Sequence, residues 1–82
     1  MDKVKGFEDL RFERIWSVWF RAVGEFPNGY GVSVITYGRH RERELYDVDV
    51  LREGRICYTT PDVNADGVSH LMARVQGLPP AN

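Results

Sequence analysis

The sequence predicts a single α+β domain: a four-stranded antiparallel β-meander with a C-terminal helix packed on one face. Two Gly-containing turn signals divide the centre of the chain into segments of alternating apolar residues. Residues 66–76 carry apolar side chains at helical spacing and are followed by a glycine. The length of 82 residues allows one domain, and 43% hydrophobic residues with 12% aromatic residues are typical of a globular chain.

Residues 10–23 fit two periods. A helical stripe comprises Phe12, Ile15, Trp16, Trp19, Phe20 and Val23, whereas Trp16, Val18, Phe20 and Ala22 alternate as in a strand. Aromatic and β-branched residues favour a strand from about Trp16 onward. Arg21 followed by Gly24 favours a helix that ends there. We expect the strand, after a short helical turn at residues 7–13, and keep the helix as the alternative.

The second strand follows a hairpin turn. Asn28-Gly29 is a favoured pair for a tight turn because both residues can adopt positive φ, and Pro27 before it requires an edge or end position. Residues 31–37 form the strand. Together with Tyr30 before it, the side chains on one of its faces are those of Val32, Val34 and Thr36.

The third and fourth strands lie between a polar tip at residues 38–44 and Pro61. Residues 45–51 alternate, with Tyr46, Val48 and Val50 pointing inward and Asp47 and Asp49 pointing outward. Glu53-Gly54 forms the next turn, and the fourth strand, residues 55–60, ends at Pro61. Cys57 lies within this strand, where we expect a buried structural thiol.

The final helix has one apolar stripe, made of Val68, Leu71, Met72 and Val75. Gly77 suits the residue after its C-terminus. The preceding Asp62-Val-Asn-Ala-Asp-Gly67 matches the first half of a calcium loop but lacks the distal carboxylate that such a loop requires. We therefore interpret Asp66 as the N-cap of the helix and expect no metal site and no cofactor.

The segment Glu-Phe-Pro-Asn-Gly-Tyr-Gly-Val-Ser-Val-Ile, residues 25–35, resembles a group of small, mostly uncharacterised bacteriophage proteins. Their pattern has an aromatic residue, Asn-Gly-Tyr-Gly, a small residue and Ser-Val, and later Tyr-x-Thr-Pro-Asp-Val, here residues 58–63. The resemblance covers about residues 25–78, although Asp49 replaces a usual small residue. It implies a phage or prophage origin and an accessory role, such as inhibition of a host defence complex. It implies no activity.

The tip at residues 38–44 is the candidate partner-binding surface. In an extended arm, Arg39, Arg41 and Arg43 share one face, a comb of guanidinium groups that suits phosphates or carboxylates. The predicted binding residues are Tyr37, Arg39, His40, Arg41 and Arg43. An aromatic beside the comb is also compatible with single-stranded nucleic acid, but no nucleic-acid motif accompanies it. The alternative is a solvated tip in which Arg and Glu neutralise each other.

The heaviest apolar cluster, Trp16, Trp19 and Phe20, exceeds what one sheet and one helix bury. We predict that it forms an interface with a partner or a second copy, with core packing as the alternative.

Other functions find less support. The net charge of −1 gives no general sign of nucleic-acid or membrane binding, and a single cysteine is typical of a reducing compartment. The charged N-terminus lacks the apolar segment of a signal peptide, so we expect the host cytoplasm. No nucleophile, metal or phosphate-loop pattern predicts an enzyme. We expect an inhibitory binding protein, with an oligomeric nucleotide or small-molecule sponge as the alternative.

Overall fold

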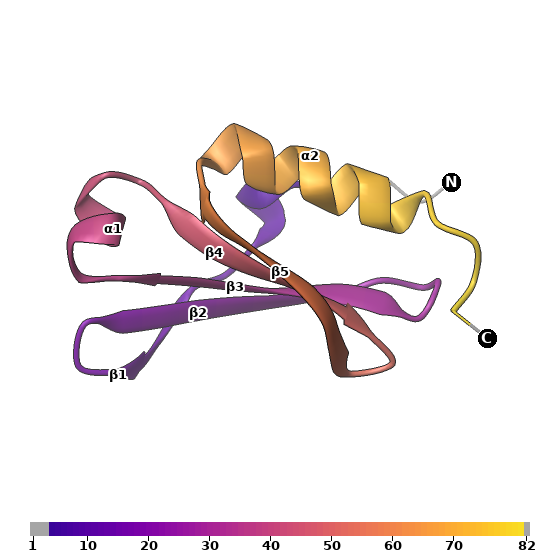
Figure 1. The fold of residues 1–82 in the computed structure, drawn as a ribbon, viewed down its shortest axis with the longest axis horizontal. Helices are drawn as coiled ribbons and strands as arrows, with labels where there is room; N and C mark the ends of the chain where they lie inside the picture. Colours follow the sequence, from indigo (N-terminus) through magenta and orange to yellow (C-terminus); the bar gives the residue numbers. More distant parts are fainter. Residues whose placement is uncertain (1–3, 82) are drawn as a thin grey trace.

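The computed structural model describes residues 4–81 and shows an antiparallel sheet with one long helix across a single face (Figure 1). The five strands are adjacent in sequence order: β1 Glu13–Trp16, β2 Trp19–Glu25, β3 Tyr30–Tyr37, β4 Tyr46–Arg52 and β5 Arg55–Val63. The helices are the 3-10 helix η1 Phe7–Asp9, the short helix α1 Gly38–Glu42 and the C-terminal helix α2 Ala65–Gln76. The α+β class, the antiparallel sheet and the C-terminal helix are confirmed.

The prediction of four strands is wrong, because residues 10–23 do not form a single strand. They contain β1 and β2, which pair as a hairpin around Ser17 and Val18. Ser17 adopts a φ of 47°, a conformation uncommon for a residue other than glycine. No Gly, Asn or Pro marks this turn, so the sequence alternates straight through it. The helix kept as the alternative is absent from this segment, and of the short helical turn expected at residues 7–13 only residues 7–9 are helical, as η1.

The two predicted hairpin turns differ in how well they match the expectation. In the β2–β3 loop only Gly29 takes a positive φ, 87°, whereas Asn28 does not. This loop is closed by hydrogen bonds from the Phe26 amide to the Tyr30 carbonyl (2.9 Å) and from the Gly29 amide to the Phe26 carbonyl (3.2 Å). In the β4–β5 turn both central residues, Glu53 and Gly54, have positive φ, 51° and 81°. That pair is typical of a two-residue turn matching the twist of its strands.

The core lies between the sheet and α2, which packs on β3, β4 and β5. Its buried members are Phe26, Val32, Val34, Val48, Val50, Val68, Met72 and Val75. Phe7, Leu10 and Phe12 from the N-terminal segment extend the same layer. Burying a valine or methionine side chain contributes about 1.5–3 kcal/mol, so each member of this cluster stabilises the folded chain.

The opposite face of the sheet is not covered by any helix of residues 4–81 (Figure 1). Paired residues of neighbouring strands share a face. The register pairs Trp19 with Tyr37, and Ile35 with both Arg21 and Asp47, and these residues lie on this open face. Cys57, which was expected to be buried, is exposed on β5. β5 is an edge strand, and this explains the exposure.

Helix α2 begins one residue earlier than predicted and has a different cap. The side chain of Asn64 accepts a hydrogen bond from the Gly67 amide at 2.8 Å, so Asn64 is the N-cap and Asp66 lies in the first turn. The predicted cap at Asp66 is therefore wrong.

Both ends of the described chain are held by hydrogen bonds. The Lys5 amide donates to Gln76 Oε1 at 2.9 Å, and the Ala81 amide donates to the Asn28 carbonyl at 2.9 Å. The flexibility expected for residues 1–9 and 79–82 falls partly on residues 1–3 and 82, which lie outside the described residues. Within residues 4–81, no helix has the length and apolar character needed to cross a bilayer.

Candidate partner-binding surface

The arginine-rich tip is a helical turn and not the extended arm that the sequence predicted. α1 covers residues 38–42, and the Arg43 amide closes the turn by donating to the Arg39 carbonyl at 3.1 Å. Arg39 and Arg43 are therefore one turn apart, whereas Arg41 projects in a different direction. All three side chains are exposed. The predicted comb on one face is wrong, because α-helical and extended backbones space alternate residues differently.

Three rings stack beside α1 on the open face of the sheet. Trp19 of β2 stacks on Tyr37 of β3, with ring centroids 4.2 Å apart and planes 20° apart. Tyr37 in turn stacks on His40 of α1 at 4.8 Å and 17°. Trp19 and Tyr37 are paired across the two strands, and this brings their rings together. The stack fixes the orientation of α1 against the sheet.

His40 also contacts an acidic residue that no local motif connects with it. Its Nε2 lies 2.6 Å from Asp62 Oδ1, at the far end of β5. The amide of Asp62 donates to Asp47 Oδ1 at 3.1 Å. Asp62 has a φ of 55°, and Asp tolerates this conformation better than most residues do. The neighbouring acid Asp49 accepts from Thr59 Oγ1 at 2.6 Å. The acids predicted to form a polar outer face therefore have specific partners.

Two arginines approach the ring of Phe20. The guanidinium carbon of Arg41 lies 4.1 Å from the ring centroid, and that of Arg14 lies 5.8 Å from it. Both distances are within the range of a cation–π contact. A shallow hollow of about 430 Å³ opens here, and its lining is Arg14, Ser17, Val18, Phe20, Gly38, Arg41 and Glu42. Phe20 is thus partly covered by cations, while Trp19 belongs to the stack on the open face.

Trp16 is the most solvent-exposed member of the predicted interface, with 73% of its surface accessible. Ile15 and Val18, its neighbours in the β1–β2 hairpin, are 48% and 54% exposed. Trp19 and Phe20 are half-buried. The structure therefore divides the predicted aromatic cluster: two rings are used for packing near α1, and one remains exposed at the turn.

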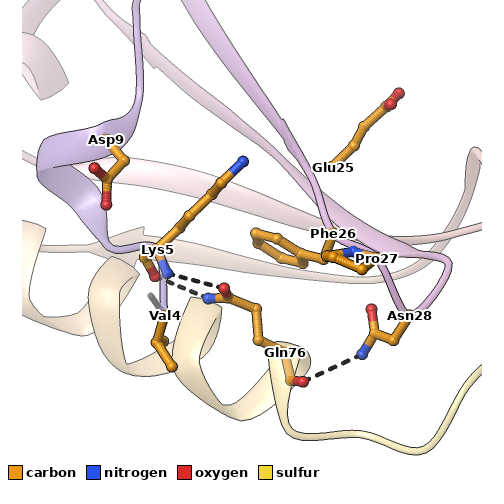
Figure 2. A pocket seen from close by; sticks show the side chains of 8 residues that line it. All are labelled: Val4, Lys5, Asp9, Glu25, Phe26, Pro27, Asn28 and Gln76. Atoms are coloured by element: carbon orange, nitrogen blue, oxygen red, sulfur yellow. Dashed lines mark hydrogen bonds between the residues drawn. The ribbon is translucent and has the colours of Figure 1, made fainter. Parts of the chain in front are cut away.

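A second hollow, of about 690 Å³, lies between the N-terminal segment, the β2–β3 loop and the end of α2 (Figure 2). The Gln76 amide bonds Lys5 in both directions, accepting from its amide at 2.9 Å and donating to its carbonyl at 2.8 Å. The charged side chains of the lining are those of Lys5, Asp9 and Glu25, and they do not converge on one point (Figure 2). This hollow is a junction between structural elements, and its polar and charged groups do not form a binding constellation. The surface around α1 is therefore the stronger candidate for a functional site.

Comparison of the chain with protein-family models, with curated proteins and with solved structures finds no match. The assignment of the candidate surface therefore rests on the geometry of its residues alone. Sequence reasoning selected Tyr37, His40 and the three tip arginines but missed Arg14, Asp47 and Asp62. These residues are distant in sequence, and only the strand register could have indicated that they reach the same end of the sheet.

Proposed function

We propose that the protein is a non-enzymatic binding protein of phage or prophage origin, which inhibits a host defence complex by docking through the end of the sheet that carries α1. The supporting observation is the composition of that end. The β1–β2 turn and α1 lie together there, away from the C-terminal end of α2 (Figure 1). They present the exposed Trp16 and four exposed arginines, Arg14, Arg39, Arg41 and Arg43, which we call the arginine cap.

The charge of the arginine cap favours an acidic partner. Among residues 4–81 the ion pair is His40–Asp62, and none of the four arginines forms one. Glu42 and Glu44 lie in the same segment but make no ion pair with them. No neighbouring carboxylate therefore neutralises these guanidinium groups, and each can pair with a carboxylate on a partner, although those of Arg14 and Arg41 also contact the Phe20 ring.

Trp16 supplies the apolar component of the docking surface. Interfaces are enriched in Trp and Arg, and the residues that dominate binding energy are most often of these types. An exposed Trp flanked by Ile15 and Val18 has no role in the core, because all three side chains are turned to solvent. Burial of this patch against a partner would remove its apolar surface from water and so contribute to binding.

The test is an inhibition assay in host cells that carry an active defence system, with capture of the target followed by mass spectrometry. Arg39, Arg41 and Arg43 are all changed to Ala. The matched control changes Arg11, Arg55 and Arg74, three exposed arginines elsewhere, so the net charge falls by the same amount. We expect the α1 variant to keep its fold but lose inhibition and target, and the control to keep both. Equal activity of the two variants would contradict the proposal.

A nucleotide or small-molecule sponge is the second candidate, and the hollow between Arg14 and Arg41 favours it. Two guanidinium groups and the Phe20 ring in one hollow suit a phosphorylated aromatic compound. Arg14→Ala separates the two candidates. It removes one side of the hollow while leaving α1 intact, so it should abolish nucleotide binding and only weaken protein binding. Mass spectrometry of small molecules released from the purified protein provides the measurement.

A further inference from the structure

Three metal-ligating side chains from three different elements converge on the open face of the sheet. His40 comes from α1, Asp47 from β4 and Asp62 from β5. One ligand atom of each lies within 4.8 Å of the ligand atoms of the other two. We propose that His40, Asp47 and Asp62 form a binding site for a divalent transition-metal ion of the zinc type. This inference does not depend on the proposed function.

The separations of the ligand atoms fit such an ion. Zinc binds imidazole nitrogen and carboxylate oxygen at about 2.0–2.2 Å, so ligand atoms in a tetrahedral site lie about 3.4 Å apart. That value falls between the 2.6 Å of the closest pair, His40 Nε2 and Asp62 Oδ1, and the 4.8 Å limit for the whole group. Small side-chain rotations would lengthen the distance between His40 and Asp62 and shorten the distances from these two residues to Asp47. The ion then replaces the direct contact between His40 and Asp62.

The fold positions each ligand before any ion arrives. Stacking on Tyr37 orients the imidazole of His40, with 17° between the ring planes. The hydrogen bond from the Asp62 amide to Asp47 Oδ1 holds the two acids together across the irregular end of the β4–β5 pairing. Groups that orient the ligands of a metal commonly change its affinity by about 10–100-fold. Tyr37 is therefore a positioning residue of this site.

The type of ligands selects the class of metal. Calcium and magnesium prefer sites made only of oxygen, whereas an imidazole nitrogen favours zinc and the later first-row metals. Three protein ligands leave the fourth position of a tetrahedral ion for water or for a group of a partner. The side chains of His40 and Asp62 are 29% and 65% exposed, so an ion can enter from solvent. The ion also offsets the repulsion between two carboxylates that face a single imidazole.

The test is titration of the purified protein with zinc chloride, followed by calorimetry and thermal unfolding. We expect one ion per chain and a rise in melting temperature that chelator reverses. His40→Ala and Asp47→Asn should each lower the zinc affinity about tenfold or more. His70→Ala and Cys57→Ser are the controls, because they remove the other histidine and the single cysteine of the chain. They should leave the affinity unchanged.

A second readout covers the case in which a ligand variant fails to fold. In the parent protein, the imidazole NMR signals of His40 should shift on zinc addition while those of His70 stay in place. Calcium at equal concentration should produce no comparable shift. The proposal is overturned if the parent binds no zinc, if Cys57→Ser or His70→Ala removes the binding, or if the His40 signals do not respond.

Discussion

Asn28 of the β2–β3 loop donates from Nδ2 to the backbone carbonyl of Val75, 2.9 Å away and 47 residues later in the chain. The same nitrogen lies 3.1 Å from the Leu78 carbonyl and 3.4 Å from the Gln76 carbonyl. The last carbonyls of a helix have no partner within the helix, so a loop residue satisfies the C-terminus of α2. Figure 2 shows the hydrogen bond between Asn28 Nδ2 and the carbonyl of Gln76. The hairpin loop thereby fixes where α2 lies.

Replacement of Asn28 by Ala should lower the free energy of unfolding by about 1–3 kcal/mol, because half-buried carbonyls lose their donor. Asn28→Asp distinguishes capping from turn formation. Aspartate is an equally good turn residue and can still accept from the Tyr30 amide, as Asn28 does at 3.2 Å. It lacks the donor, however, and adds negative charge at a helix C-terminus. Urea unfolding should show Asp to be at least as destabilising as Ala. An Asp variant as stable as the parent would contradict the capping role.

The Asn-Gly-Tyr-Gly motif shows how far the sequence can be interpreted alone. Turn chemistry predicted the hairpin correctly, yet it explains only part of the motif. A Cβ on Gly29 would lie 2.9 Å from Ala81 Cβ, and one on Gly31 would lie 2.6 Å from the Gly24 carbonyl oxygen. Gly29 is thus required by close approach to the distant Ala81, Gly31 by close approach to the paired strand β2, and Asn28 by its bonds to α2. Such long-range constraints leave no periodic signal in a single sequence.

The strand count and the tip conformation were missed for a related reason. Sequence patterns reveal turns that use Gly, Pro or Asn, but Ser17 reverses the chain at positive φ without such a residue. At the tip, alternation of Arg and Glu is compatible with either an extended arm or a helical turn. Contacts outside the segment decide between them, namely the Tyr37–His40 stack and the His40–Asp62 bond. Of the candidate surface, the sequence therefore predicted which side chains take part but not their geometry.

The N-cap of α2 gives a second prediction about stability. Asn64→Ala should destabilise the protein by about 1 kcal/mol, because the Gly67 amide loses its acceptor at 2.8 Å. Asp66→Ala should cost about 0.5 kcal/mol, the usual contribution of an acid in the first turn through the helix dipole. Chemical denaturation of both variants provides the measurement. The reverse order of the two effects would restore Asp66 as the cap.

Tyr46 predicts a change of stability at alkaline pH. Burial, with a smaller contribution from Glu44, raises the pKa of its phenol above the ordinary value of 10.0, although Arg41 acts in the opposite direction. A raised pKa means that the folded state holds the phenolic proton more tightly than the unfolded chain does. The resulting stabilisation is fully present below about pH 10 and is lost as the pH rises through the raised pKa of the folded state.

Tyr46→Phe should therefore resist alkaline unfolding better than the parent does. The phenyl ring keeps the contacts with Phe7 and Phe12, whose centroids lie 5.0 and 5.6 Å from that of Tyr46, but it carries no ionisable group. The unfolding free energy of the variant, relative to that of the parent, should rise as the pH increases from about 9 to about 11. Tyr58→Phe, an exposed ring on β5, is the matched control. A difference that stays constant with pH would show that Tyr46 does not contribute in this way.

Self-association through the β1–β2 hairpin is the last prediction. Trp16 is 73% exposed and belongs to a hairpin at the edge of the sheet, where unpaired backbone groups of β1 can pair with a second copy. β5, the other edge, is 9 residues long but contains Pro61 and two irregularities in its pairing, against one irregularity in β1, and these features disfavour further strand addition. We therefore expect that, in the absence of the partner proposed above, the chain forms a homodimer through β1.

Sedimentation at micromolar concentration should show dimers of the parent protein and monomers of Trp16→Ala. The substitution should change the free energy of unfolding of the monomer by about 0.5 kcal/mol or less, because a surface side chain away from the core contributes little. Ile56→Ala is the matched control, since Ile56 is 62% exposed on the opposite edge strand. It should leave the dimer intact. If Ile56→Ala dissociates the dimer and Trp16→Ala does not, β5 is the interface, and a parent that remains monomeric leaves Trp16 available for a different protein partner.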